Sequence, residues 1–340
     1  MELSNNIQFS IILPVRNGGE YVKECAKSIL SQTYGNFNFI VLDNCSTDGT
    51  AEWLESLNDP RIVIYRSDKS LSIEENWART VGVPKNEFIT LIGHDDVLES
   101  NYLEVMEKLI KKYPDASLFQ THFNLIDSQS KVIRPSRPMQ AVEDAESFLT
   151  SIMTKRFDIV GTGFLMRSAD YDKLGGIPDY PGLLFADYEL WLNLTKIGYK
   201  VTAEEVCFSF RIHQSATTTS SDKKIQDAFE RFVKYLQDVQ ASGPEYRNVI
   251  LENGEAFLLS ECKAMCHRLL RTPRQNGTTE LSVKNTVDTF VGYAKRLIPG
   301  KPFDPMKESS IKLAALIDKS KLGRNLFLMF KKMYSKPVLK

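Results

Sequence analysis

Two adjacent carboxylates, Asp95 and Asp96, follow directly on a short apolar run from Phe88 to Ile92. The run has the length of a buried strand, and a helix is expected to start near Ser100. In an open α/β sheet, ligands bind at the carboxyl ends of the strands, where hard oxygen ligands suit Mg²⁺ or Mn²⁺ carrying a diphosphate. A solvated turn with an Asp helix cap has the same local pattern, so the pair alone leaves both interpretations open.

The elements that must position this pair alternate between apolar strands and amphipathic helices. Four runs of strand length precede the pair, at 7–14, 37–42, 61–65 and 88–92. Such alternation implies right-handed crossovers and a mainly parallel sheet with its loops gathered at one edge. We therefore expect the loops 14–19, 43–50 and 93–97 to share one crevice.

The pattern loosens after residue 112. Strands are predicted at 116–123, 159–166 and 199–210, a helix at 143–153, and a proline-containing loop at 131–140. From about residue 220 onward only helical stripes follow.

The totals are those of an ordinary globular chain of 340 residues, 42% hydrophobic and 25% charged. The 43 basic and 43 acidic residues balance, which excludes a global field that would gather nucleic acid. The five cysteines are odd in number and scattered, which favours a reducing cytoplasm over a disulfide framework. With no signal-peptide pattern and no run of about 18 apolar residues, a cytoplasmic location is expected.

The last segment, from Lys319 onward, carries seven Lys or Arg and no acid. Five of its apolar residues fall on one helical stripe: Leu322, Leu326, Met329, Phe330 and Met333. A basic amphipathic helix of this kind lies on an anionic membrane surface or docks on its own domain. The first alternative would make the protein peripheral on the inner face of the membrane.

Four ordered motifs together resemble the GT-A glycosyltransferases of family 2, of the type that builds bacterial polysaccharides and glycolipids. They are SIILPVRN at 10–17, SILSQTY at 28–34, LDNCSTDGT at 42–50 and HDD at 94–96. The resemblance implies a GT-A fold, Rossmann-like, with a mainly parallel sheet flanked by helices and an α-helical C-terminal region. It covers about residues 7–215. We expect a transferase domain at 1–218, with a nucleotide-binding half of about 1–100 and an acceptor half of about 101–218, and a helical region at 219–340.

The resemblance also assigns roles at the acidic pair. Asp96 corresponds to the metal-binding acid of the family's DXD-type motif, and Asp95 to the acid that faces the donor ribose or sugar. The divalent ion, Mn²⁺ or Mg²⁺, acts as a Lewis acid toward the departing nucleoside diphosphate. His94 stands where relatives often have a small or acidic residue, so this motif offers two carboxylates instead of three.

The loop after the second strand resembles the base-binding Asp-Asp-Gly-Ser of the family, with Asp43 retained and Asn44 in place of the second Asp. An amide carbonyl can accept the uracil N3 proton, while its NH₂ can meet a carbonyl of another base. Pro14 and Arg16 match the first-strand motif that lines the nucleotide. Arg79 lies where the family often places a cation near the base or phosphates, although an exposed helix arginine fits the pattern equally.

On the acceptor side, Asp187 matches the second acid of the family's Glu-Asp motif, with Ala186 in place of the Glu. Inversion requires one group to take the proton from the attacking hydroxyl, and one carboxylate can do so; an Asp at a helix start is also a common cap. His213, after the last core strand, resembles the histidine that completes the metal sphere in many relatives.

The resemblance thus implies an inverting, metal-dependent hexosyltransferase that moves a sugar from a nucleotide-sugar donor, with UDP-sugars favoured, to a glycan or lipid-linked glycan acceptor in cell-surface polysaccharide synthesis. One alternative is a metal-dependent nucleotidyltransferase, which also uses a sheet crevice and acidic loops. The other is a degenerate transferase that only binds. Asn44 and Ala186 support that alternative, whereas the retained Asp96 and Asp187 oppose it.

Overall fold

The structure is a computed structural model that describes residues 6–212, 221–271 and 281–334. The chain divides into two units, and each has its own buried core. The first unit comprises residues 1–148 and 156–214, and the second comprises residues 149–155 and 215–340.

Within the described residues, the first unit is built on one sheet of ten strands. The strands are β1 (Phe9–Val15), β2 (Phe37–Asp43), β3 (Ile62–Arg66), β4 (Phe88–Leu91), β5 (Val97–Leu98), β6 (Leu118–Ile126), β7 (Val132–Pro135), β8 (Val142–Glu143), β9 (Leu165–Arg167) and β10 (Lys200–Arg211). Their order is β3-β2-β1-β4-β9-β6-β10-β5, with β7 beside β6 and β8 beside β10.

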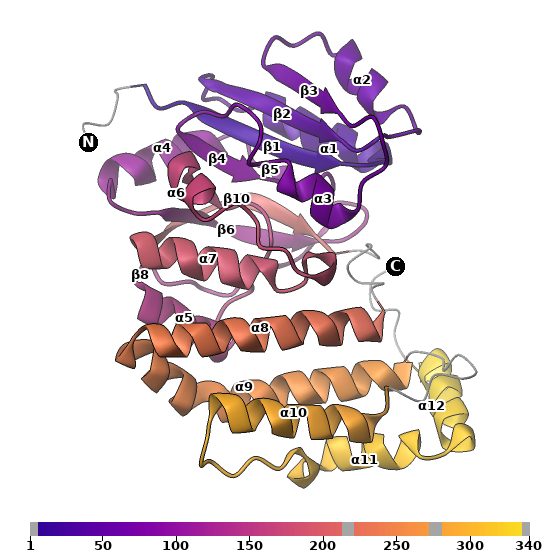
Figure 1. The fold of residues 1–340 in the computed structure, drawn as a ribbon. Coiled ribbons are helices and arrows are strands. Elements are labelled where there is room, and N and C mark those ends of the chain that lie inside the picture. The colour runs from indigo at the N-terminus through magenta and orange to yellow at the C-terminus, as the bar shows by residue number, and fades with distance from the viewer. Residues whose placement is uncertain (1–5, 213–220, 272–280, 335–340) are drawn as a thin grey trace. The chain divides into compact units, whose positions relative to one another are not determined.

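Figure 1 shows β3, β2 and β1 side by side and the sheet continuing through β4 to β6 and β10. The pairs β1–β2, β2–β3, β1–β4 and β6–β10 are parallel, while β9 runs antiparallel to both β4 and β6. All residues of β1 and β4 are buried, as in a sheet covered on both faces. The predicted mainly parallel α/β sheet is confirmed.

The helices of the first unit alternate with its strands along the chain. They are α1 (Gly19–Leu30), α2 (Thr50–Ser56), α3 (Ile73–Ala78), α4 (Tyr102–Lys112), α5 (Ala145–Met153, which continues into the second unit), α6 (Ser168–Lys173), the 3-10 helix η1 (Pro181–Leu183) and α7 (Ala186–Ile197). The start of α3 is fixed by a capping box, in which Ser72 and Glu75 satisfy each other's backbone N–H groups.

Two predictions about local structure were wrong. The segment 131–140, predicted as a loop because of its prolines, contains the exposed strand β7, which pairs with β6. Pro135 ends β7 at the edge of the sheet, where its missing N–H is tolerated. The predicted strand 159–166 is shorter and begins at Leu165, because Gly163 has a left-handed φ of +76°.

The second unit is helical throughout its described residues. Its helices are α8 (Asp222–Ser242), α9 (Pro244–Arg271), α10 (Val283–Leu297), the 3-10 helix η2 (Pro305–Lys307), α11 (Ser309–Asp318) and α12 (Lys321–Tyr334). Aromatic rings from three helices form its core: Phe229 lies 5.2 Å from Phe290 and 6.2 Å from Phe257, between ring centroids. The predicted helical C-terminal region is therefore confirmed.

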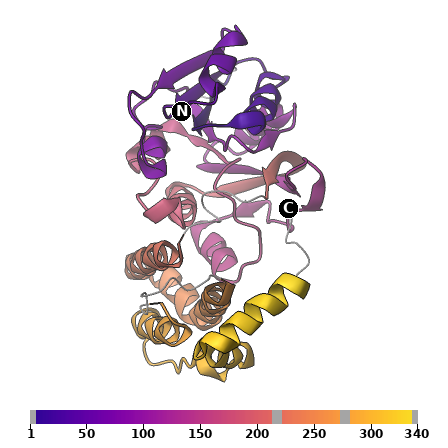
Figure 2. The same cartoon turned by 90° about the vertical axis from the view of Figure 1, so that its right-hand side faces the viewer.

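Helix α12 packs on α9 and α11 through one side only. Arg324 is buried there and donates to the carboxylate of Asp318 at 2.5 Å and to the carbonyl of Leu269. Figures 1 and 2 show α12 in yellow beside α11. The apolar stripe identified in the sequence remains exposed on the other side. No helix in the described part of the chain has the length and apolar character needed to span a bilayer.

Candidate active site

The first part of the site lies at the carboxyl ends of β1 and β2. Val15 and Asp43 are register partners, and the N–H of Asn44 donates to the carbonyl of Val15 at 2.9 Å. Asp43 is buried. Its Oδ2 accepts from the N–H of Ser46 at 3.3 Å, whereas its Oδ1 is buried without a hydrogen-bond partner among the described residues. A buried acceptor without a donor is costly, so Oδ1 is suited to a donor on a ligand.

Asn44 has a different local role from its neighbour. Its Nδ2 donates to the carbonyl of Leu71 at 2.9 Å, and its Oδ1 accepts from the N–H of Leu71 at 2.7 Å. Both functional atoms of the amide therefore hold the segment that enters α3. These two bonds leave Asp43 better placed than Asn44 to accept a hydrogen bond from a base.

Arg79, at the end of α3, joins the ends of two strands. Its guanidinium donates to the carbonyl of Asp43 at 3.1 Å and to the carbonyl of Tyr65 at 2.6 Å. Burial lowers the pKa of Arg79 from its usual value. The residue is thus half-buried beside Asp43 instead of being the exposed helix arginine that the sequence also allowed.

The loops after β1 and β2 are tied together by hydrogen bonds. The N–H of Asn17 donates to Ser46 Oγ at 2.9 Å, the N–H of Gly18 to Thr50 Oγ1 at 2.9 Å, and the N–H of Gly19 to Asp48. Pro14 is buried within β1, and Arg16 is exposed at its end. Two of the three loops expected to share a crevice are therefore adjacent.

The two acids of the third loop converge over Gly93. A Cβ added at Gly93 would lie 2.7 Å from Asp95 Oδ1 and 3.1 Å from Asp96 Oδ2, so only glycine leaves room for both carboxylates. Asp95 is half-buried and Asp96 is buried. Burial, followed by the charge of Asp95, raises the pKa of Asp96 well above its ordinary value of 3.8.

Both oxygens of Asp96 are held by the surrounding protein. Oδ2 accepts from the hydroxyl of Thr162 at 2.5 Å, and Oδ1 accepts from the N–H of Arg211 at 3.0 Å. Thr162 lies shortly before β9, the antiparallel partner of β4, and Arg211 ends β10, so the carboxylate is fixed by residues far away in the sequence. Each oxygen retains a further lone pair for another ligand.

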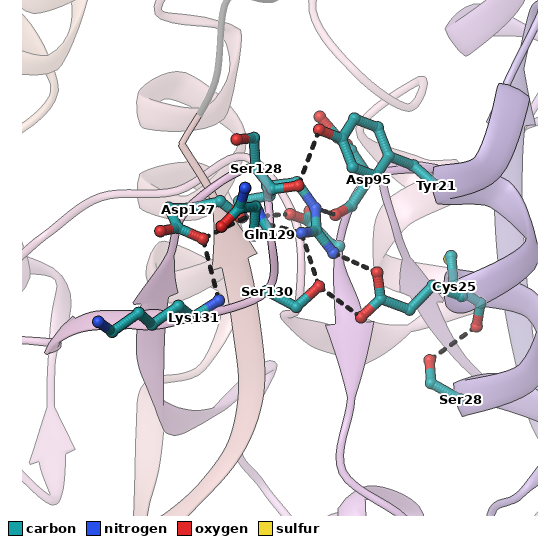
Figure 3. Close-up of polar contacts among 12 residues, drawn as sticks. Tyr21, Cys25, Ser28, Asp95, Asp127, Ser128, Gln129, Ser130 and Lys131 are labelled. Carbon is teal, nitrogen blue, oxygen red and sulfur yellow. Dashed lines mark hydrogen bonds and ion pairs between the residues drawn. The ribbon is translucent and has the colours of Figure 1, made fainter. Parts of the chain in front are cut away.

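The side chain of Arg211 is fully buried and links the acidic loop to neighbouring segments. Its Nε donates to the carbonyl of Asp95 at 2.7 Å, its Nη1 to the carbonyl of Asp127 at 3.0 Å, and its Nη2 to Glu24 at 2.7 Å. The guanidinium also lies 4.5 Å from the ring centroid of Tyr21. Figure 3 shows Tyr21, Asp95 and the turn 127–131 gathered in this network. Arg211 therefore positions the loop that carries both acids.

Asp187 lies in the first turn of α7, after an unusual backbone path. Gly182, Leu183 and Phe185 have positive φ angles of 68°, 58° and 67°. Asp187 Oδ1 accepts from the N–H of Tyr188 at 3.0 Å. Burial raises the pKa of Asp187 from 3.8 to about 6. A carboxylate with this pKa is a suitable proton acceptor near neutral pH.

The segment 161–162 brings the two sides of the site together. A Cβ at Gly161 would lie 3.9 Å from Asp187 Oδ2, while the hydroxyl of the next residue, Thr162, bonds to Asp96. Consecutive Cα atoms are about 3.8 Å apart. Asp96 and Asp187 therefore border the same short segment instead of opening onto separate surfaces.

The residues present fit a divalent cation carried by a diphosphate. No group of three or more His, Cys, Asp or Glu converges within 6–212, 221–271 and 281–334. Mg²⁺ sites of this kind use one or two carboxylates and take their other ligands from phosphate and water. The converging oxygens of Asp95 and Asp96 match that requirement. His213, the predicted further ligand, lies outside the described residues.

The sequence interpretation missed the residues that hold the acids in place. Thr162 and Glu24 carry no recognisable local motif, because their partners are 66 and 187 positions away. Arg211 was visible as a cation two residues before His213, at the end of a predicted strand. That placement was the only available signal.

Comparisons with known proteins agree with this architecture. Residues 10–175 match the family model described as Glycosyl transferase family 2. The UDP-Glc:alpha-D-GlcNAc-diphosphoundecaprenol beta-1,3-glucosyltransferase WfgD of Escherichia coli is 23% identical over 231 residues, covering 67% of this chain and 87% of that protein.

Two solved structures share the fold. One is Staphylococcus aureus TarS 1–349 in complex with UDP-GlcNAc, with a TM-score of 0.67 and 12% identity, covering 98% of this chain and 95% of that one. The other is the mannosyltransferase PcManGT of Pyrobaculum calidifontis in complex with GDP-Man and Mn²⁺, with a TM-score of 0.52 and 13% identity, covering 97% and 89%.

The mainly parallel sheet with polar loops at one edge and the C-terminal helical region make up a GT-A fold like that of TarS. Residues 10–175 of the chain match glycosyl transferase family 2. The protein is accordingly a glycosyltransferase related to enzymes that use nucleotide-sugar donors.

Proposed function

We propose that this protein is an inverting glycosyltransferase that transfers a hexose from a nucleoside-diphosphate sugar to a glycan or lipid-linked glycan acceptor in cell-surface polysaccharide synthesis. The observation that carries the proposal is the segment 161–162, which borders both Asp96 and Asp187. An inverting transfer needs the leaving diphosphate and the proton acceptor on opposite sides of one anomeric carbon, and this segment lies between the two groups that would serve them.

Asp43 is proposed to bind the base of the donor. Its unpaired Oδ1 can accept the N3–H of uracil, which is why UDP-sugars are favoured. TarS was crystallised with UDP-GlcNAc, which supports that preference. Guanine also has a ring N–H, and PcManGT binds GDP-Man, so GDP-sugars belong in the donor screen. Pro14, Arg16 and Arg79 would line the nucleotide around Asp43.

Asp96 is proposed to hold Mn²⁺ or Mg²⁺, with His213 as a further ligand, and the neighbouring Asp95 to face the donor ribose or sugar. When bound, the cation would neutralise charge on the leaving diphosphate. The protein residues do the remaining work: Thr162 and Arg211 orient Asp96, and Gly93 allows the two carboxylates to converge.

Asp187 is proposed to accept the proton of the attacking hydroxyl. Its raised pKa keeps the carboxylate basic enough to do so while it is still largely ionised at neutral pH. A lipid-linked acceptor is supported by the name of the Escherichia coli relative, which acts on a diphosphoundecaprenol-linked sugar.

A nucleotide-sugar screen with Mn²⁺ or Mg²⁺, followed by product analysis, tests the proposal. We expect one donor to raise the melting temperature and to release nucleoside diphosphate in a metal-dependent way. Asp95→Asn and Asp96→Ala should abolish the release, whereas Asp115→Asn, at an exposed position before β6, should leave it unchanged. Pyrophosphate release would indicate a nucleotidyltransferase instead, and binding without turnover would indicate a non-catalytic module.

A further inference from the structure

The exposed side of α12 is apolar along its length. Leu322, Leu326, Met329 and Met333 have exposed fractions between 56% and 73%, and Phe330 is 57% exposed. At 3.6 residues per turn these five side chains occupy an arc of about 100°. The opposite side of the helix carries Arg324 and Phe327 and faces α9 and α11.

Helix α11 extends this surface. Leu313 and Leu316 are 57% and 66% exposed, and α11 packs directly against α12. Half of the large hydrophobic residues found exposed in the described chain therefore lie within 309–334. We call the seven residues Leu313, Leu316, Leu322, Leu326, Met329, Phe330 and Met333 the α11–α12 face. A concentration of this kind marks an interaction surface.

The charge around the α11–α12 face is of one sign. Residues 319–340 contain seven Lys or Arg and no acid. The last acid before this segment in the sequence, Asp318, is buried and already paired with Arg324. An apolar stripe with a purely basic surround complements a surface that is apolar inside and anionic outside.

A cavity of about 260 Å³ lies between α9, α11 and α12 and combines the same two properties. Its apolar wall includes Leu270, Leu313, Ala314, Ile317 and Phe327. Its polar lining comes from His267, Arg271, Lys331 and Ser310, and the hydroxyl oxygen of Ser310 is buried without a hydrogen-bond partner among the described residues. Cations and an unpaired hydroxyl beside an apolar wall suit an anionic headgroup joined to a hydrocarbon chain.

We propose that the α11–α12 face docks on an anionic phospholipid bilayer, with the cavity receiving the headgroup region of one lipid. The five side chains of α12 would enter the boundary between headgroups and acyl chains. Lys321 is exposed at the edge of the stripe and would remain at the level of the phosphates. This role is separate from the chemistry of the sheet, and it would keep the enzyme at the surface where lipid-linked substrates reside.

Vesicle flotation with the full-length protein tests the proposal. Vesicles of phosphatidylcholine alone are compared with vesicles of two parts phosphatidylcholine to one part phosphatidylglycerol. We expect the protein to float only with the anionic vesicles. The double variant Leu326→Glu/Met329→Glu should weaken binding at least about tenfold. The double variant Arg271→Gln/Lys331→Gln should weaken it by about fivefold for each cation removed.

The matched control is Val132→Glu/Ile133→Glu on β7. These residues are 51% and 39% exposed, so the variant adds the same charge at exposed apolar positions elsewhere. We call the double variant Leu326→Glu/Met329→Glu the α12 variant. Retained vesicle binding by the control together with loss of binding by the α12 variant supports the proposal. Equal flotation of wild type and α12 variant, or no flotation of the wild type, overturns it. A wild-type dimer that the α12 variant converts to a monomer, without any change in flotation, overturns it in favour of self-association.

Activity toward a soluble acceptor keeps this proposal separate from the proposed function. The α12 variant should release nucleoside diphosphate at the wild-type rate with a soluble acceptor, because its substitutions lie in the second unit. Loss of flotation with intact transfer supports the membrane role. Absence of transfer in the wild type, with flotation intact, contradicts the transferase proposal and leaves the docking proposal standing.

Discussion

Replacing Asp187 by Asn should make the protein more stable and nearly inactive at the same time. Burial raises the pKa of this carboxyl from 3.8 to about 6, which means that the folded state favours the protonated form. The charged form therefore lowers the stability of the folded state. This energetic cost is absent below the pKa of the unfolded state and is fully present above the pKa of the folded state. This rise in the pKa corresponds to about 3 kcal/mol of folding free energy. The partial exposure of Asp187 reduces the expected change in stability to about 1–3 kcal/mol.

The neutral amide removes this penalty without changing the size of the side chain. Denaturant unfolding should show Asp187→Asn more stable than wild type by about 1–3 kcal/mol at about pH 7.5, and by less at about pH 5, where the wild-type carboxyl is mostly protonated. Sugar transfer should fall by about 10²–10⁴, because the proton acceptor is lost. Donor affinity, measured by calorimetry, should not change, since the donor-side residues are untouched.

The matched control is Asp170→Asn, which makes the same substitution in the first turn of α6. It should leave the rate of transfer unchanged. Transfer by Asp187→Asn within a factor of about ten of wild type would remove the residue from the role of base. Parallel loss of donor affinity and transfer would place it on the donor side.

Three further predictions concern the loops of the sheet. Gly93→Ala should separate the converging carboxylates of Asp95 and Asp96. The Mn²⁺ concentration needed for half-maximal diphosphate release should therefore rise by at least about tenfold, while the melting temperature without metal should change little. Asp43→Ala should weaken binding of the preferred nucleoside diphosphate by about 1–3 kcal/mol, measured by calorimetry, because the base N–H loses its acceptor; unchanged affinity would contradict the base-binding role of Asp43. Arg211→Lys should lower the free energy of unfolding by about 2–3 kcal/mol, measured by denaturant unfolding, because an ammonium cannot reproduce the bonds to Asp127, Glu24 and Asp95. A variant as stable as wild type would show that this network is dispensable.

The fold was predictable from the sequence because most of its strands and helices have a recognisable local pattern of apolar residues. Apolar runs such as Phe88–Leu91 have strand length, and the helices between them bury one face. The short strand β5 and the exposed strand β7 were missed for the opposite reason, since a two-residue strand and an edge strand carry little hydrophobic pattern.

The side-chain bonds within the site were not predictable in the same way. The sequence shows Asn44 at a position that related enzymes use for the base, but it cannot show that both ends of the amide are bonded to the backbone of Leu71. Likewise, Asp43 could be named, yet its unpaired Oδ1 is a property of the folded environment. Residue types and order predict which groups gather, whereas tertiary contacts decide which atoms remain available.

The backbone before α7 makes the approach to Asp187 a place of stored strain. Leu183 and Phe185 adopt left-handed conformations that each cost about 1–2 kcal/mol for residues with a side chain. Selection for heat resistance alone would therefore favour glycine or asparagine at these two sites. Mutagenesis for higher stability should leave both positions unchanged. A relaxed backbone at the start of the helix would let the Asp187 carboxylate move, and turnover would fall as stability rises.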